Sequence, residues 1–286
     1  MNDLIDSARP QHLLLATDLT ARCDRPLDRA KQLALEWRAG LTALVVQQGP
    51  STPEEVSAWL DGGDTSHAFA PAARAELAEE FAGTGVEPVL QVLEGDVTDG
   101  ILAAAATLGN GLVVIGASSD VAVHEVILGS TATRLVQDLA QPLLVVRRRT
   151  RGPYARILVA NDFSDASRQA LGTAVRLFPD RPITLFHAID AEADAAEATA
   201  RSRQFLDASV PDAGQRGRIG VAVGHGLVSE AIGRRVVEDA IGLVVIGVHP
   251  QWTVARVFKG STSEDLLQQL PCDALLVRAA EGGDDG

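Results

Sequence analysis

Residues 111–131 read GLVVIGASSDVAVHEVILGST, and this stretch decides how the chain is organised. An apolar run typical of a buried strand leads into a loop, and the loop ends in Gly-Ser-Thr, which is typical of the start of a helix. The pattern occurs twice, because GLVVIG returns at residues 242–247 and Gly-Ser-Thr returns at 260–262, both 131 positions further on. This fixed displacement indicates an internal duplication.

In each repeat the glycine at the end of the strand lies thirteen positions before the glycine at the start of the helix, as Gly116 and Gly129 and as Gly247 and Gly260. The first N–H groups of a helix have no intrahelical partner, and together with the helix dipole they suit phosphate oxygens. The hydroxyl side chains beside them belong to Ser130, Thr131, Ser261 and Thr262. Two hypotheses follow: a phosphate site, or serines that only cap their helices.

The glycine spacing resembles the signature of the universal stress protein family, G-x-x-G-(nine residues)-G-S/T, and the resemblance extends over nearly the whole chain as two tandem repeats. In ATP-binding members the signature surrounds the ribose and the phosphates. The second glycine of the signature is replaced here by Ser119 and by Pro250. Serine is small and can donate a hydrogen bond, whereas proline has no N–H group and a fixed φ. The first repeat is therefore the better candidate for a nucleotide pocket.

The first strand of each repeat ends in an aspartate. Residues 13–20 read LLLATDLT and residues 157–164 read ILVANDFS, which places Asp18 and Asp162 where ligands of open α/β sheets bind. An aspartate before a helix is also a common cap, so both interpretations stand. The resemblance implies that the aspartate lies beside the adenosine part of a nucleotide.

Helices and strands alternate along both repeats, which predicts an α/β fold with parallel sheets. The resemblance implies two tandem doubly wound domains, each with five strands in the order 3-2-1-4-5. After the first strand we expect a helix at 24–40 that Gly40 ends, a strand at 41–47, a loop at 50–65, a helix at 71–83, a strand at 86–93, a helix at 95–108, a helix at 130–139 and a strand at 142–147. The second repeat is thirteen residues shorter and lacks a counterpart of the 50–65 region.

Residues 147–156 read RRRTRGPYAR, a basic patch with glycine and proline that we interpret as the boundary between domains 1–149 and 150–286. A solvated linker that balances acidic neighbours is favoured over an anion or partner site. The acidic end of the second domain, AAEGGDDG, is predicted to be disordered. The resemblance also implies that the fifth strands, at 142–147 and 274–278, pair within one chain as a pseudo-dimer. A homodimer of whole chains is left open.

The formal net charge of −13 opposes binding to nucleic acid and to anionic membrane surfaces. No apolar run reaches the roughly 18 residues of a spanning helix, and no signal peptide precedes the first strand, so we expect a cytoplasmic protein. Cys23 and Cys272 occupy non-equivalent positions without metal-ligand spacing, and we interpret them as ordinary reduced thiols.

Motifs for catalysis are incomplete. His124 and Glu125 begin a zinc-protease motif, but Leu128 stands in place of the second histidine, and Lys259 precedes Gly260 where a phosphate-binding P-loop needs it to follow. We therefore predict no catalytic residue and at most slow ATP hydrolysis. His187 is predicted to be a structural strand-end histidine, and no role is assigned to His249.

The first functional hypothesis is a regulatory stress-response protein that binds an adenine nucleotide in its first repeat, with ATP as the ligand and Mg²⁺ as a possible companion. The resemblance implies that Asp18 contacts the ribose or the adenine. It also implies that Gly116 and Ser119 line the loop and that the phosphates are held by Gly129, Ser130 and Thr131. The less favoured second-repeat set is Asp162, Gly247, Gly260, Ser261 and Thr262. The alternatives are a scaffold or signalling adaptor without nucleotide, and capture of another small anion or acyl ligand.

Overall fold

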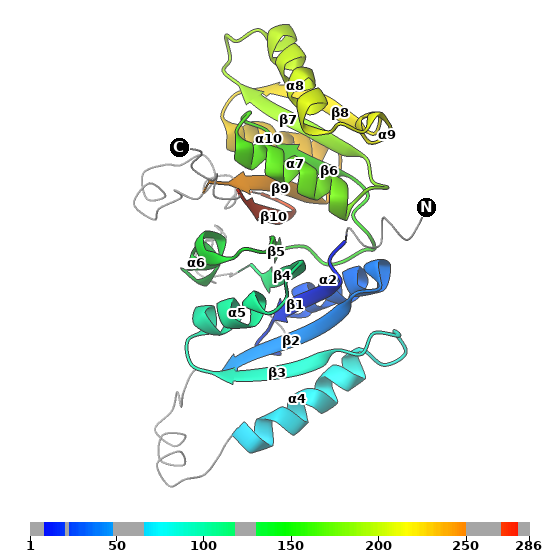
Figure 1. Cartoon of the computed structure of the whole chain (residues 1–286), viewed down its shortest axis with the longest axis vertical. Coiled ribbons are helices and arrows are strands. Elements are labelled where there is room, and N and C mark those ends of the chain that lie inside the picture. Colours follow the sequence, from blue (N-terminus) through cyan, green and yellow to red (C-terminus); the bar gives the residue numbers. More distant parts are fainter. Residues whose placement is uncertain (1–8, 21–22, 48–65, 118–129, 250–269, 280–286) are drawn as a thin grey trace.

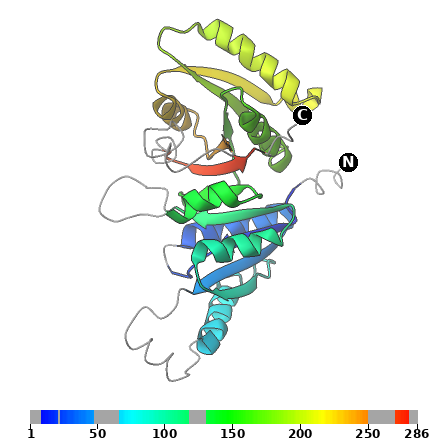
Figure 2. The ribbon, with the colours of Figure 1, turned by 60° about the vertical axis from the view of Figure 1, so that its left-hand side comes forward.

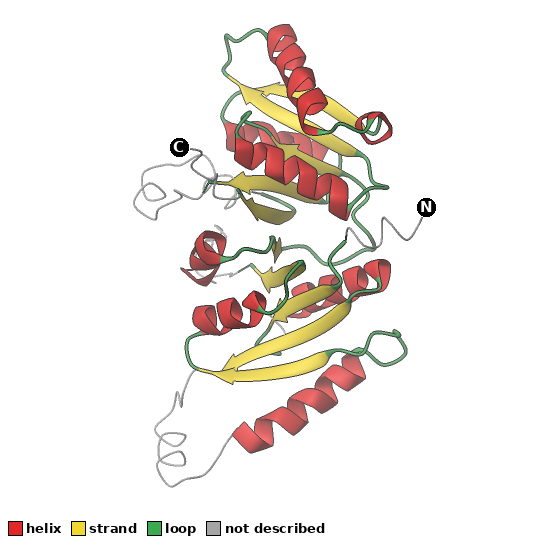
Figure 3. Ribbon diagram, in the orientation of Figure 1, coloured by secondary structure: helices red, strands yellow, loops and turns green. Residues whose placement is uncertain are grey.

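The computed structural model describes residues 9–20, 23–47, 66–117, 130–249 and 270–279. The strands of the first repeat are β1 (His12–Ala16), β2 (Gly40–Gln47), β3 (Val89–Glu94), β4 (Gly111–Gly116) and β5 (Leu143–Val146). Its helices are α2 (Asp24–Trp37), α4 (Ser66–Glu80), α5 (Val97–Ala106) and α6 (Ser130–Asp138). Strands and helices alternate as the sequence predicts (Figure 3).

The second repeat follows the same order. Its strands are β6 (Ile157–Ala160), β7 (Ile183–Ile189), β8 (Ile219–His225), β9 (Leu243–Val248) and β10 (Asp273–Arg278). Its helices within the described residues are α7 (Asp165–Leu177), α8 (Ala195–Ser209), α9 (Ala213–Arg216) and α10 (Val228–Glu238). The sequence does not predict the short helix α9, which Asp212 caps by accepting a hydrogen bond from the N–H of Gln215.

The ten strands of the described residues form one sheet in the order β3-β2-β1-β4-β5-β10-β9-β6-β7-β8 (Figure 1). Within each repeat the neighbours are parallel, and each repeat has the order 3-2-1-4-5. The two repeats meet at β5 and β10, which pair antiparallel with Leu275 opposite Leu144. The predicted pairing of the fifth strands within one chain is therefore confirmed.

The central strands are apolar between their end residues, because helices bury both faces of the sheet. Helices α2, α4, α7 and α8 contribute to the core on one face, and α5, α6 and α10 contribute to the core on the other. Both cores contain residues of both repeats, so apolar packing runs across the seam between β5 and β10. Figure 2 shows this seam edge-on between the two halves of the molecule.

The strand register locates the length difference between the repeats. Leu13 lies opposite Leu41 and Ile157 lies opposite Ile183, so β1 and β6 are offset by 144 positions and β2 and β7 by 142. Gln47 lies opposite Glu94 and Ile189 lies opposite His225, so β3 and β8 are offset by 131. Eleven of the thirteen extra residues therefore fall between β2 and β3, and the predicted loop at 50–65 lies outside the described residues.

Several predicted helix boundaries were wrong: the helices predicted at 71–83 and 95–108 end at Glu80 and Ala106, and three further boundaries differ for local reasons. Helix α2 ends at Trp37 because Arg38 takes a left-handed conformation with φ 52°, and Gly40 begins β2 with no room for a side chain beside the His12 ring. Helix α4 starts at Ser66 and contains Pro71, whose fixed φ is compatible with a helix although its N–H bond is lost. Helix α5 starts at Val97 because Asp96 caps it.

The linker between the repeats is more tightly packed than predicted. Arg148, Arg149 and Arg151 are exposed, but Tyr154 is buried in the core. The carbonyl of Gly152 accepts a hydrogen bond from Arg29 at 2.9 Å. Most of the linker is exposed, as predicted, but Tyr154 anchors it in the core, because an aromatic ring has enough apolar surface to pack between the repeats.

Candidate functional site

The carboxyl end of β1 forms a fixed turn around Asp18. One carboxylate oxygen of Asp18 accepts hydrogen bonds from the N–H and the hydroxyl of Thr20, at 2.9 and 2.7 Å. The hydroxyl of Thr17 accepts from the N–H of Leu19, which has a left-handed φ of 56°. These local bonds hold the exposed carboxylate in one orientation beside the end of β4, the neighbour of β1.

The second repeat builds the same turn with other side chains. Asn161 accepts from the N–H of Phe163, whose φ is 68°, and Asp162 accepts from the N–H of Ser164 at 3.0 Å. The hydroxyls of Ser164 and Ser167 also donate to Asp162. The turn therefore survives in both repeats, although only the aspartate itself is identical.

Both aspartates are held ionised by these donors. Partial burial opposes the charge on Asp18, but the hydrogen bonds from Thr20 and from the Cys23 side chain outweigh it, and its pKa lies below the usual value. Burial likewise opposes the charge on Asp162, and the bonds from Ser164 and Ser167 again lower its pKa. A carboxylate of this kind accepts hydrogen bonds, as from a ribose hydroxyl, and is a poor proton donor at neutral pH.

In the second repeat a histidine also approaches the aspartate. The Nε2 atom of His249, directly after β9, lies 3.8 Å from Oδ2 of Asp162. Sequence analysis gave His249 no role because its partner is 87 positions earlier in the chain. The adjacency of β6 and β9 in the sheet brings them together.

Gly247 has a packing role. A Cβ atom at this position would lie 2.2 Å from the carbonyl oxygen of Ala166 and 2.8 Å from the amide nitrogen of Ser167. The first turn of α7 therefore crosses directly over the end of β9, and only glycine permits this approach. One glycine of the signature is explained in this way by helix packing.

The predicted phosphate residues are only partly described. Helix α6 begins at Ser130, as expected, and Thr131 lies in its first turn. Gly116 ends β4. The other predicted residues of the loops and of the second helix start lie outside the described part of the chain: Ser119, Gly129, Pro250, Gly260, Ser261 and Thr262.

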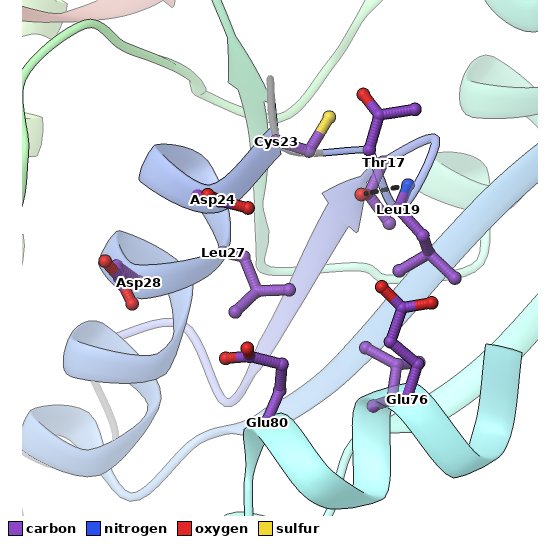
Figure 4. A pocket seen from close by; sticks show the side chains of 10 residues that line it. Thr17, Leu19, Cys23, Asp24, Leu27, Asp28, Glu76 and Glu80 are labelled. Atoms are coloured by element: carbon purple, nitrogen blue, oxygen red, sulfur yellow. Dashed lines mark hydrogen bonds between the residues drawn. The ribbon is translucent and has the colours of Figure 1, made fainter.

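A cavity of about 210 Å³ lies between α2 and α4, next to the turn at Asp18 (Figure 4). Its apolar lining comes from Leu19, Leu27 and Leu77. Four carboxylates belong to its wall, and Glu76 and Glu80 project from α4 toward α2 in Figure 4. The full lining is Thr17, Leu19, Thr20, Cys23, Asp24, Leu27, Asp28, Glu76, Leu77 and Glu80, so Asp18 itself does not line it.

The acidic wall of this cavity disfavours phosphate, because four carboxylates repel another anion. Glu80 is partly neutralised by Lys31, whose Nζ lies 3.4 Å from Oε2. Burial, with the nearby Asp18 carboxylate, raises the pKa of the Cys23 thiol. No group of three or more His, Cys, Asp or Glu side chains in the described residues could hold a metal ion.

Sequence analysis missed this cavity because its lining comes from the β1 turn and from two helices about fifty residues apart. His187 is structural as predicted, with Nδ1 at 2.7 Å from the carbonyl oxygen of Asn161. Both cysteines are free thiols. Burial raises the pKa of Cys272 to about 12. No helix in the described residues is long and apolar enough to cross a bilayer.

The model of the universal stress protein family matches this chain twice, over residues 10–147 and 153–278. A universal stress protein from Archaeoglobus fulgidus DSM 4304 has a similar structure, with a TM-score of 0.69 and 18% identity over 98% of this chain and 99% of that chain. A functionally unknown protein from Pseudomonas aeruginosa PAO1 has a TM-score of 0.64 and 18% identity over 97% and 95%. No curated protein matches the chain. At these identities the two structures establish a shared fold.

Proposed function

Because the chain belongs to the universal stress protein family, we propose that it binds an adenine nucleotide, ATP, in its first repeat and serves a stress response as a regulatory protein. The observation that carries the choice of repeat is the difference between the two strand-end aspartates. Both carboxylates are exposed, but Asp18 is oriented by Thr20 and the Cys23 thiol, whereas Asp162 is held by two serine hydroxyls and approached by His249.

A ligand of Asp162 would have to compete with these protein donors. Displacing a hydrogen bond to a charged group costs about 1.5 to 3 kcal/mol unless the ligand replaces it. The donors on the two aspartates correspond in number, but the Cys23 thiol on Asp18 is a weaker donor than the Ser167 hydroxyl on Asp162, so a ribose hydroxyl gains more by binding to Asp18. This argument favours the first repeat independently of the replacement of the second signature glycine by Ser119 and Pro250.

The phosphates belong, in this proposal, at the start of α6 and away from the acidic cavity. The first N–H groups of a helix have no intrahelical partner, so the start of α6 at Ser130 and Thr131, with the positive end of its dipole, suits anions, while the carboxylates between α2 and α4 repel them. Gly116 and Ser119 would line the loop, and Gly129 would permit close approach of the phosphates. Any Mg²⁺ would arrive with the nucleotide and be held mainly by its phosphates.

The competing function is an adaptor of the same fold that binds no nucleotide. The second repeat shows how such a site becomes less available, because serine hydroxyls already occupy one oxygen of its aspartate. An adaptor would use the same sheet and seam, and its partners would be proteins.

The test is calorimetric titration of Mg-ATP into nucleotide-free protein and into Asp18→Ala, with Asp162→Ala as the matched control. We expect one site per chain and at least about a tenfold rise in Kd in Asp18→Ala, which corresponds to roughly 1.4 kcal/mol, with little change in Asp162→Ala. Gly129→Val should weaken binding through the phosphates. Loss of binding in Asp162→Ala alone would move the site to the second repeat. No heat and no thermal shift would favour the adaptor.

A further inference from the structure

The seam between the repeats contains one fully buried carboxylate, Asp273 at the start of β10. One oxygen accepts from the backbone N–H groups of Arg147 and Arg148, at 2.8 and 2.9 Å. The other accepts from the hydroxyl of Tyr154 at 2.7 Å and lies 3.5 Å from Nε of Arg29. Two segments that precede β6, helix α2 and the linker between the repeats, therefore converge on one side chain from the last strand.

Arg29 is itself buried and has its position fixed by this arrangement. Its guanidinium carbon lies 3.9 Å from the centre of the Tyr154 ring, and its Nη1 donates to the carbonyl of Gly152 at 2.9 Å. A buried guanidinium needs a nearby negative charge, and Asp273 provides it. The charge pair is therefore part of the interface between the repeats.

The backbone of the seam is nearly symmetric, whereas this network is not. Leu144 lies opposite Leu275, its own equivalent in the second repeat. On either side of this pair, Leu143 lies opposite Leu276 and Val145 lies opposite Ala274, so the pairing is symmetric about Leu144 and Leu275. With the offsets of 131 and 144 positions, the first repeat has Pro142 in place of Asp273, and the second repeat has Thr173 in place of Arg29. The ion pair between Arg29 and Asp273 can therefore form only where a first repeat packs against a second repeat.

Pairing of two identical strands would leave charges buried without partners. Two β5 strands would bury two Arg29 side chains with proline where the carboxylate should be. Two β10 strands would bury two Asp273 carboxylates beside threonines, and the N–H of Ala279, the equivalent of Arg148, already donates to the carbonyl of Val248 at 2.9 Å. Each arrangement carries the high cost of an unpaired buried charge.

We propose that Asp273 selects the partner of this seam: it admits the first repeat and excludes the β10 edge of a second copy of the chain. The pairing of fifth strands alone does not distinguish these partners, because both edges are short, apolar and almost equivalent. The Asp273 carboxylate makes the β10 edge specific for the first repeat, although the backbone of the edge is symmetric. The chain therefore closes on itself rather than joining other chains through β10.

Disulfide trapping tests this selection in the full chain. Cys23→Ser, Cys272→Ala and Leu275→Cys leave one thiol, which faces Leu144 in the native seam and faces its own copy when two β10 strands pair in the same register. The protein is unfolded in urea, refolded at high concentration and oxidised, and disulfide-linked dimer is measured. We expect little dimer with Asp273 present, and at least about tenfold more in Asp273→Ala, because the variant no longer buries two carboxylates.

Two further variants separate selection from simple weakening of the seam. Asp273→Asn keeps the shape and an acceptor oxygen, so it should fold and give an intermediate increase in dimer. Arg29→Met also weakens the native seam but keeps the carboxylate, so it should give no more dimer than the parent. Equal dimer in Arg29→Met and Asp273→Ala would overturn the proposal, and so would an absence of dimer in both Asp273 variants.

Discussion

The space between the first two helices is open in one repeat and filled in the other. In the first repeat Leu19, Asp24 and Glu76 line a cavity of about 210 Å³. The offset of 144 positions in the first strand and helix equates Leu19 with Phe163 and Asp24 with Arg168. Helices α4 and α8 are aligned by their buried residues, which are offset by 129 positions: Ala73, Leu77 and Phe81 correspond to Ser202, Leu206 and Val210. The same offset equates Glu76 with Phe205.

These replacements build a compact cluster in the second repeat. The ring of Phe163 lies 4.4 Å from that of His187 and 5.8 Å from that of Phe205. The guanidinium of Arg168 lies 5.0 Å from the centre of the Phe205 ring, and that of Arg201 lies 4.1 Å from the Phe163 ring. Aromatic rings and cations thus occupy the region where the first repeat has carboxylates and empty space.

The comparison separates what the duplication fixed from what it left free. Leu19 and Phe163 share a left-handed backbone, and the hydrogen bonds of their turns correspond one to one. Side-chain size and charge have diverged at three positions beside those turns, while Leu27 and its counterpart Leu171 are identical. The backbone is constrained by the sheet, while a cavity next to it can be opened or filled by three substitutions.

The largest effect is expected from emptying the filled side. Phe205→Ala removes a buried ring that packs against Phe163, and we expect the free energy of unfolding to fall by about 3 kcal/mol. The matched change Glu76→Ala removes an exposed side chain and should stay within about 0.5 kcal/mol. Urea unfolding followed by circular dichroism measures both, and similar losses in the two variants would show that the cavities do not differ as described.

A smaller loss is expected where the second repeat leaves no space at all. Gly247→Ala places a Cβ atom 2.2 Å from the carbonyl oxygen of Ala166, and the required shift of α7 should cost about 2 kcal/mol. Gly220→Ala in β8 is the control, because its nearest neighbour would be 3.9 Å away, and we expect almost no change. The same unfolding experiment checks both, and a tolerant Gly247→Ala would show that the close contact with α7 is not maintained in solution.

The fold was predictable from the sequence because its main determinants are local or repeated. GLVVIG and its copy locate β4 and β9. Helix boundaries were less predictable, since Arg38 ends α2 in a conformation that sequence rules assign to glycine. Such a choice depends on the packing of Trp37 and on the start of β2.

The parts of the site that could be predicted from the sequence are those that depend on a single residue. Asp18 and Asp162 follow directly from the ends of two apolar runs. The cavity depends on Glu76 and Glu80 reaching toward a turn about sixty residues earlier, and Asp273 depends on partners from two distant segments, α2 and the linker. No spacing rule connects these residues, because the order of strands in the sheet sets their distances.

The two aspartates should differ in their contribution to acid stability. Both have a lowered pKa in the folded state, so their stabilisation is complete above the unfolded value of about 4 and is lost as the pH falls through the folded value. Asp162 accepts from two serine hydroxyls, whereas Asp18 has one threonine hydroxyl and the weaker thiol donor Cys23. Asp162→Asn should therefore reduce the dependence of unfolding free energy on pH between 5 and 2 more than Asp18→Asn does.

Because both carboxylates are largely solvated, each effect should be below about 1 kcal/mol. Urea unfolding at a series of pH values measures them, with the chain itself as reference. An equal change in the two variants would mean that the serine donors of the second repeat add nothing to the threonine and thiol donors of the first.

The smallest effect is expected from filling the open side. Glu76→Phe introduces the aromatic residue that the second repeat has at this position, where it can cover Leu19 and Leu27, and it removes one of four neighbouring carboxylates. Burial of part of the ring, at about 25 cal/mol per Å², is opposed by a slightly lower helix propensity, so we expect a gain of about 0.5 kcal/mol in unfolding free energy. Glu79→Phe, on the same helix but outside the cavity, has no such surface to cover and should give no gain. If the two variants change stability equally, the space between α2 and α4 is not available to a side chain, and the contrast between the repeats rests on charge alone.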